Sequence, residues 1–176
     1  GLLLEASGRI GTTLDVDLTA GELADIAMPD FAQHVTVDLA EWVIGLEDNA
    51  PDCGHLRFRR GAVRTTRVTD RIRPVGTPIS YSGTSAQARC LMEKGPVLDP
   101  LLTPEAVGPH WTGEGPHTSV IAAPIIVRGT ILGVASFYRF GEDDMFVADD
   151  VKLAGELASR AAVALDNARR YQRERM

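Results

Sequence analysis

The chain has 176 residues, of which 44% are apolar, enough for one domain with a single hydrophobic core. Its net charge of −6 excludes a general nucleic-acid-binding surface, because phosphate contacts require clustered Lys and Arg. Basic residues gather at 57–60, 64–73 and 169–175, where the acidic balance favours solvated strand and helix faces. The sequence contains no run of about 18 apolar residues, the length that could span a membrane. We therefore expect a cytoplasmic protein without a membrane partner.

Two cysteines, Cys53 and Cys90, are too few for a disulfide scaffold, and neither belongs to a C-x-x-C pair. We therefore expect reduced thiols. The sequence begins without a methionine, inside a segment with helical pattern, and we interpret it as a fragment of a longer protein whose effector domain lies elsewhere.

Two helices are predicted within the first 28 residues. Helical spacing links four positions at the start of the chain: Leu3, Ser7, Ile10 and Leu14. The stretch Thr19-Ala-Gly-Glu22 has the pattern of a capping box, in which the threonine oxygen and the glutamate satisfy backbone N–H groups of a second helix. Met28-Pro29 ends that helix.

Strands follow. Residues 31–43 alternate in character, with Val35, Val37 and Leu39 on one face and His34, Thr36 and Asp38 on the other, as in a half-buried strand. Residues 56–68 are interpreted as one strand or as a kinked pair around Gly61.

The middle of the chain is less regular. Residues 74–83 are rich in Pro, Gly and Ser, and Thr84-Ser-Ala-Gln87 is a second capping-box pattern that opens a short helix to Lys94. Residues 96–99 form a short predicted strand. Residues 100–118 contain four prolines and three glycines, a composition typical of an irregular segment folded over another part of the protein.

The last third of the chain is the most informative. Two apolar runs, 120–127 and 131–137, flank Arg128-Gly129, where glycine permits the positive φ of a tight hairpin. Three-and-four spacing of apolar residues then predicts a long helix over 149–176. A hairpin without a helix between its strands argues for an α+β domain with a central antiparallel sheet of about six strands.

This end of the sequence resembles the GAF domain family. The residues that carry the resemblance are Pro124, Arg128, Gly129, Gly133, Val134, Asp149, Asp150, Asn167, Ala168, Arg169 and Tyr171. Segments 9–15, 22–27 and 37–39 are similar to the GAF segments that precede PPM-type (sporulation phosphatase-like) serine/threonine phosphatase domains in actinobacteria.

The resemblance implies one domain over residues 1–176. It places N-terminal helices at 1–28, the sheet at 31–140 with pocket-covering segments within 81–118, and an exit helix at 148–176. The first and last helices would share one face of the sheet, and a ligand pocket would lie on the other. The residues implied to line the pocket are Tyr81, Arg89, Leu91, Trp111, His117 and Ser136.

Signatures of catalysis are missing from the sequence. It has no Gly-x-Ser-x-Gly elbow, no P-loop and no His-Glu-x-x-His pair, so we expect no catalytic and no metal-binding residues. The marks of cyclic-nucleotide-binding and bilin-binding GAF domains are also missing, which leaves the cofactor unknown. Trp111 could either plug the pocket or stack on what enters it.

The exit helix has an inner face of small and apolar residues that could pack against a partner helix or against the chain's own sheet. The residues assigned to such a dimer or connector surface are Leu157, Ala161, Leu165, Ala168 and Tyr171. In related domains, terminal helices form the homodimer and pass a signal to the next domain.

These observations predict a non-catalytic regulatory domain that binds an unidentified small molecule or relays a signal to an effector in the same chain. A PPM-type phosphatase is the expected effector, with a histidine kinase or a transcription regulator as the alternative. Two further alternatives are a structural dimerisation module with a filled pocket, and an enzyme of the methionine sulfoxide reductase kind, which would need reactive pocket cysteines.

Overall fold

The computed structural model describes residues 2–66, 72–100 and 118–176. Its centre is a six-stranded sheet in the order β3-β2-β1-β6-β5-β4, and every neighbouring pair is antiparallel. The strands are β1 (His34–Ala40), β2 (Phe58–Thr65), β3 (Pro78–Ile79), β4 (Val97–Asp99), β5 (Thr118–Val127) and β6 (Thr130–Phe140). The predicted α+β class with about six antiparallel strands is confirmed.

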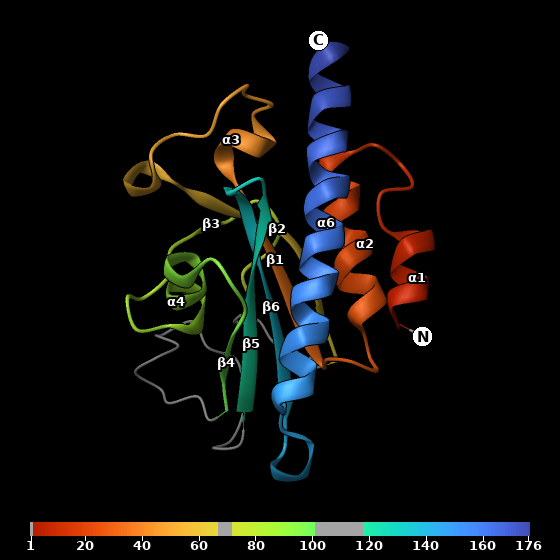
Figure 1. The fold of residues 1–176 in the computed structure, drawn as a ribbon, viewed down its shortest axis with the longest axis vertical. Helices are drawn as coiled ribbons and strands as arrows, with labels where there is room; N and C mark the ends of the chain where they lie inside the picture. Colours follow the sequence, from red (N-terminus) through yellow and green to blue (C-terminus); the bar gives the residue numbers. More distant parts are fainter. Residues whose placement is uncertain (1, 67–71, 101–117) are drawn as a thin grey trace.

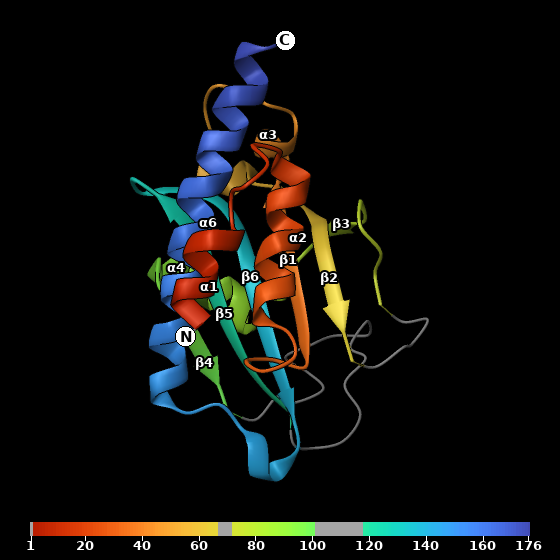
Figure 2. The same ribbon diagram turned by 90° about the vertical axis from the view of Figure 1, so that its right-hand side faces the viewer.

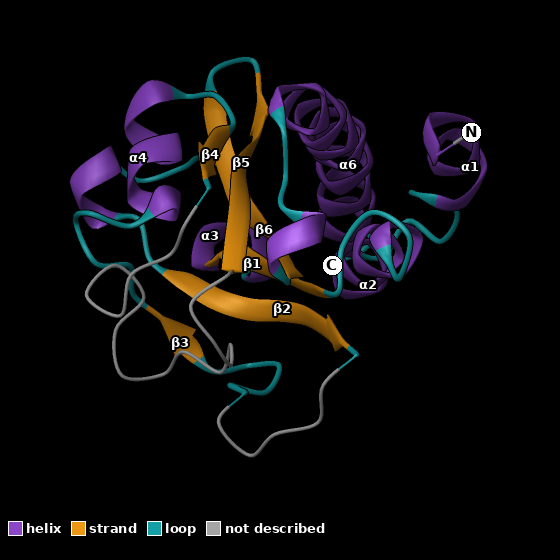
Figure 3. Cartoon of the chain, turned by 90° about the horizontal axis from the view of Figure 1, so that it is seen from below, coloured by secondary structure: helices purple, strands orange, loops and turns teal. Residues whose placement is uncertain are grey.

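Helices cover both faces of the sheet (Figures 1 and 3). The helices are α1 (Leu2–Arg9), α2 (Val16–Ala27), α3 (Glu41–Ile44), α4 (Ala86–Glu93) and α6 (Ala148–Glu174), with 3-10 turns η1 (Cys53–His55) and η2 (Glu142–Asp144). Helices α2 and α6 pack on one face, here called the helix face, and α4 packs on the other, here called the α4 face. Helix α1 contacts α2 and α6 from outside (Figure 2).

The hairpin between β5 and β6 has the predicted turn. Arg128 and Gly129 have φ values of 50° and 79°, so both central residues adopt the left-handed conformation that a two-residue hairpin of matching twist requires. The turn fixes the register that places the two longest strands side by side.

The cap of helix α2 lies four residues before the predicted one. Its cap is Asp15, whose Oδ1 accepts a hydrogen bond from the Leu18 N–H at 2.9 Å. Thr19 lies inside the helix and donates to the Asp15 carbonyl, while Glu22 accepts from Thr12. The capping-box prediction at Thr19 was wrong because a carboxylate earlier in the chain supplies the acceptor instead.

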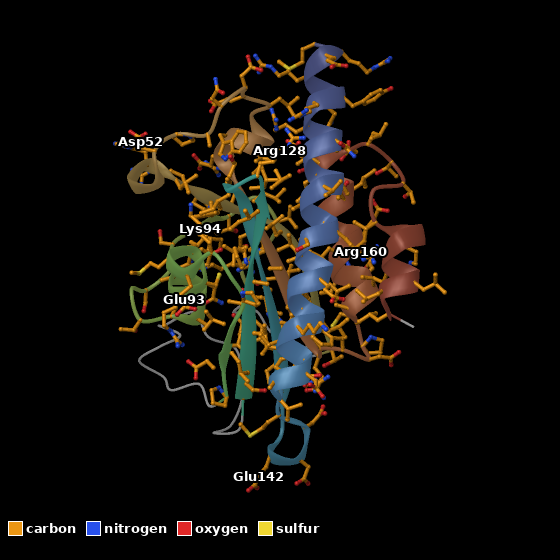
Figure 4. The ribbon with its side chains drawn as sticks, in the orientation of Figure 1. Asp52, Glu93, Lys94, Arg128, Glu142 and Arg160 are labelled. Carbon is orange, nitrogen blue, oxygen red and sulfur yellow. The ribbon has the colours of Figure 1, made fainter. Side chains whose placement is uncertain are left out.

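Helix α4 lies where the second capping box predicts it. Its cap is Ser85, which accepts from the Ala88 N–H at 3.1 Å, one residue after the predicted Thr84. The helix ends at Lys94, whose φ of 55° is left-handed. Glu93 and Lys94 extend from this end of the helix (Figure 4).

Strand β1 is buried on both faces, not on one. All seven of its residues are buried, including the polar row His34, Thr36 and Asp38. The prediction of a half-buried strand was wrong because β1 lies between β2 and β6 in the middle of the sheet, with helices on both sides. The polar row is therefore an internal layer of the protein.

The inner face of α6 packs on the chain's own core. Leu157, Ala161, Leu165 and Ala168 are each 0% exposed, whereas Tyr171 is 41% exposed. Of the five residues assigned to a dimer surface, Tyr171 is thus the one with substantial exposed area. Although α6 has 27 residues, neither it nor any other helix in the described part of the chain is long and apolar enough to cross a membrane.

Candidate functional site

The α4 face of the sheet carries a layer of buried polar side chains. The register between β1 and β6 opposes His34 to Tyr138 and Thr36 to Ser136, so these four side chains point to the same face. All four residues are at most 8% exposed. The helix face, by contrast, is built from aliphatic and aromatic residues of the same strands, such as Val35 and Phe137.

Asp38 is the most deeply buried acid of this layer, with 1% of its surface exposed. Its Oδ1 accepts a hydrogen bond from Arg60 Nε at 2.7 Å, and its Oδ2 accepts one from the Tyr81 hydroxyl at 2.7 Å. Burial raises the pKa of Asp38, although the charges of Arg60 and Arg73 and the two hydrogen bonds oppose that shift. Asp38 therefore ties strand β2 and the segment before α4 to the centre of the sheet.

A second set of hydrogen bonds joins α4 to β6. Gln87 Nε2 donates to the Ser136 hydroxyl and to the Tyr138 hydroxyl, each at 3.0 Å. The ring of His34 meets that of Tyr138 edge-on, with centroids 5.3 Å apart. Burial, and then the charge of Arg60, lowers the pKa of His34 to about 4, so its imidazole is neutral at physiological pH.

The residues that the resemblance placed in the pocket are distributed as follows. Tyr81 and Ser136 belong to the two hydrogen-bond sets just described. Arg89, on α4, pairs with Asp99 through Nη2 and Oδ2 at 3.1 Å. Leu91 is half-buried on α4 and packs against the core. Trp111 and His117 lie outside the described residues.

Asp38, Arg60 and Gln87 are the functional candidates that sequence reasoning missed. The signal for Asp38 was present, because an acid in the middle of a strand of alternating residues is either solvated or buried with a partner. Its partners could not be read from the sequence, because they depend on the β1–β2 register, which opposes Asp38 to Arg60 across a bulge.

The buried thiol has the properties of a core residue. Cys90, on α4, is 0% exposed, and burial raises its pKa to about 12, so the thiolate is suppressed. Within residues 2–66, 72–100 and 118–176, no group of three or more His, Cys, Asp or Glu side chains is placed to hold a metal ion.

The exit helix is attached to the segment that follows β1. The guanidinium of Arg169 lies 5.1 Å from the centroid of the Trp42 ring, and its Nη1 donates to the Glu47 carbonyl at 3.0 Å. One turn later, Arg173 Nη2 donates to Asp48 at 2.8 Å. Because Trp42 follows Asp38 by four residues, the polar layer and the exit helix are linked through a short stretch of chain.

These features define an α+β domain of the GAF fold. The chain matches the GAF domain family over residues 17–166 and belongs to that family. Members of the family are regulatory and sensory domains. None of the curated proteins matches the chain.

Several solved structures share the fold. The GAF domain of a phosphoenolpyruvate-protein phosphotransferase from Coxiella burnetii has a TM-score of 0.67 and 14% identity, with 97% of this chain and 94% of that chain covered. A free methionine-R-sulfoxide reductase from Neisseria meningitidis has a TM-score of 0.69 and 14% identity, covering 97% and 89%. The GAF-B domain of DevS from Mycobacterium smegmatis has a TM-score of 0.60 and 17% identity, covering 94% and 99%. At these identities the likeness extends to the fold alone.

Proposed function

We propose that this chain is a non-catalytic sensory domain that binds a small molecule against the α4 face and signals to an effector domain through α6. The observation that carries the proposal is the Asp38–Arg60–Tyr81 network. It places a carboxylate and a guanidinium in the interior, where the side chain of Asp38 is 2% exposed and that of Arg60 is 11% exposed.

The network is poorly explained by stability alone. Desolvating two charges offsets much of their attraction, and replacing a buried ion pair by apolar residues of similar size is often neutral or stabilising by about 1–4 kcal/mol. Clusters of buried polar groups with shifted pKa values gather at binding sites. Asp38 and Gln87 also attach the sheet to the segment 81–93, which is the part of the structure that would have to adjust around a ligand.

The route to the effector follows from the contacts of α6. A ligand bound against the layer that contains Asp38 would act on β1, which continues into α3 and the Trp42–Arg169 contact. A shift in that contact would change the position of the C-terminal turn of α6. For the effector, we favour a PPM-type serine/threonine phosphatase in the same cytoplasmic protein, on the resemblance of residues 167–175. A histidine kinase or a transcription regulator remains the alternative.

A homodimer through the terminal helices belongs to the same proposal. A groove of about 530 Å³ lies between α6 and residues 10–14, which follow α1. Its lining includes Leu14 and Val163, which are 38% and 54% exposed, and Arg160 borders it (Figure 4). This groove also supports the second candidate function, a structural dimerisation module that binds no ligand.

An enzyme of the sulfoxide reductase kind is the least supported reading, because a cysteine nucleophile must form a thiolate. We expect Cys90 to resist a thiol reagent such as 5,5′-dithiobis(2-nitrobenzoate) at pH 8 and to react only after unfolding. The measurement uses the Cys53→Ser variant, so that one thiol is counted. Rapid labelling of Cys90 in the folded protein would revive the enzymatic reading.

Native mass spectrometry tests the sensor proposal. The purified chain is measured under native and denaturing conditions, with an ultraviolet-visible spectrum of the same sample and after incubation with a small-molecule extract of the expression host. A mass excess that denaturation removes supports the sensor. A bare mass in every sample, with a dimer as the main species, supports the structural module instead.

A further inference from the structure

Two buried polar atoms on the α4 face have no hydrogen-bond partner among the described residues. They are Nε of Arg89 and Oγ1 of Thr118. Thr118 is 1% exposed, so its hydroxyl is out of reach of bulk water. Unpaired buried polar atoms are rare in native proteins because desolvating them without compensation is unfavourable, and each therefore needs an explanation.

The two residues lie toward the same end of the α4 face. Arg89 pairs with Asp99, and Asp99 lies opposite Val120 in the β4–β5 register. Thr118 is two residues from Val120 along β5, so its side chain points to the same face as that of Val120. The side chain of Ser119, between them, points to the helix face, where its hydroxyl accepts from the Phe146 N–H at 3.0 Å.

At the other end of the layer, the polar side chains bond to one another. Arg60 and Tyr81 each occupy one oxygen of Asp38. Gln87 likewise donates its amide N–H groups to the hydroxyls of Ser136 and Tyr138. A ligand that enters without breaking these bonds meets the unpaired polar atoms of this face at the Arg89–Thr118 end.

We infer that Arg89 Nε and Thr118 Oγ1 form the subsite that recognises a trigonal oxygen acceptor of the ligand, the oxygen of an amide or of a carboxylate. This inference rests on the proposed sensory function and names the chemistry of its ligand. The Nε–H of a guanidinium can only donate a hydrogen bond, and a threonine hydroxyl can donate as well as accept one. Two donors can meet one carbonyl oxygen or the two oxygens of one carboxylate.

The ion pair with Asp99 positions the Arg89 donor. Asp99 accepts from Nη2, and the neighbouring Nε–H of the same planar guanidinium has no partner among the described residues. Because Asp99 balances the charge of Arg89, the subsite does not demand an anion, and both a neutral amide and a carboxylate satisfy the donors. A cationic amine without an acceptor oxygen does not.

Thr118→Val separates a ligand-binding hydroxyl from a structural one. Valine has nearly the shape of threonine but lacks the hydroxyl, so the variant removes an unpaired polar atom from the free protein. We expect its urea midpoint to be equal to or higher than that of the original chain. Thr130→Val, at the opposite end of the same hairpin, is the matched control. A clearly lower midpoint for Thr118→Val would show that the hydroxyl is bonded within the protein, and would overturn the inference.

Binding is measured by nuclear magnetic resonance with three probes of one size: butyramide, butyrate and butylamine. The signals followed are the side-chain N–H groups of Gln87 and Arg89 Nε–H. We expect butyramide or butyrate to move both signals and butylamine to move neither. The affinity should fall about 5-fold in Thr118→Val and in Arg89→Lys, which keeps the charge opposite Asp99 but lacks Nε–H, and should not change in Thr130→Val.

The outcomes are distinct. Tighter binding of butyramide than of butyrate identifies a neutral ligand, and the reverse identifies a carboxylate. The inference fails if the Gln87 signal moves while Arg89 Nε–H stays in place, if the two variants bind as well as the original chain, or if no probe moves either signal. The native mass measurement decides the sensory function separately, since a retained ligand supports that function whichever residues hold it.

Discussion

The guanidinium group of Arg169 lies over the indole ring of Trp42, 5.1 Å from its centroid, and attaches the exit helix to the short helix that follows strand β1. Trp42 is itself fixed by a hydrogen bond from Nε1 to the Ile131 carbonyl at 3.1 Å. Arg169 is also bound to Asp166, through Nη2 and Oδ1 at 3.0 Å, and both side chains are 8% exposed. This contact is the physical connection between the polar layer and the C-terminal end of the domain.

Replacing Arg169 by methionine should destabilise the domain by about 2 kcal/mol, because it removes the cation over Trp42 and leaves Asp166 with Arg170 as its remaining partner. The free energy of unfolding in urea measures the loss. Arg175→Met is the control, since Arg175 lies 5.3 Å from the ring centroid of the exposed Tyr171. It should change stability by less than about 0.5 kcal/mol. Equal losses in the two variants would mean that the Trp42 contact contributes nothing specific.

The Asp38–Arg60 pair should matter more for binding than for stability. The single change Asp38→Leu leaves the Arg60 guanidinium without its counter-charge and should cost about 3–5 kcal/mol. The double change Asp38→Leu with Arg60→Met should regain most of that stability. Urea unfolding measures both, and native mass spectrometry shows whether the double variant still retains a ligand. We expect it not to.

An exposed ion pair provides the matched control for this experiment. Arg64 and Asp25 also meet through Nε and Oδ1, at 2.6 Å, but their side chains are 42% and 46% exposed. The same pair of replacements there should change stability by about 1 kcal/mol or less and leave the ligand bound. If the buried double variant keeps its ligand, Asp38 and Arg60 are structural and the site lies elsewhere.

How far the sequence predicts this domain depends on the range of the interactions involved. The hairpin at Arg128-Gly129 was predictable because glycine and local alternation determine it. The burial of Asp38 was not predictable, because its partners Arg60 and Tyr81 come from a strand and a loop that are distant along the chain and meet it only in the fold. The predicted cap of α2 was wrong for a different reason. Asp15 and Thr19 are both residue types that cap helices well, and the helix in the folded chain begins after Asp15.

The close approach of β6 to β1 requires glycine at position 133. A Cβ added there would lie 2.3 Å from the carbonyl oxygen of Asp38, which is backbone and cannot rotate away. Gly133→Ala should therefore separate the two central strands and cost about 3 kcal/mol in unfolding free energy. Gly8→Ala is the control, because nothing lies within 4 Å of the added atom in helix α1, and alanine there should be neutral or stabilising. A Gly133→Ala protein as stable as the original would contradict the close β1–β6 packing.

His34 should make the stability of the domain depend on pH. Burial lowers its pKa from 6.5 to about 4, so the unfolded chain takes up a proton at a higher pH than the folded chain. The contribution of His34 is then fully present above about pH 6.5 and is lost as the pH falls toward 4, amounting to about 2 kcal/mol between pH 7.5 and pH 5. Asp38, whose pKa burial raises, acts in the opposite direction at the acidic end of this range.

Unfolding free energies measured from pH 7.5 to pH 5 test this dependence. His34→Phe keeps a ring beside Tyr138 but cannot titrate, so its stability should fall less with decreasing pH than that of the original chain. Asp38 is present in both proteins, and its effect largely cancels in the difference. His55→Asn, at an exposed position, should leave the original pH dependence intact. Parallel curves of unfolding free energy against pH for the original chain and His34→Phe would show that His34 is not held neutral in the folded domain. The polar layer would then accommodate a protonated imidazole at this position.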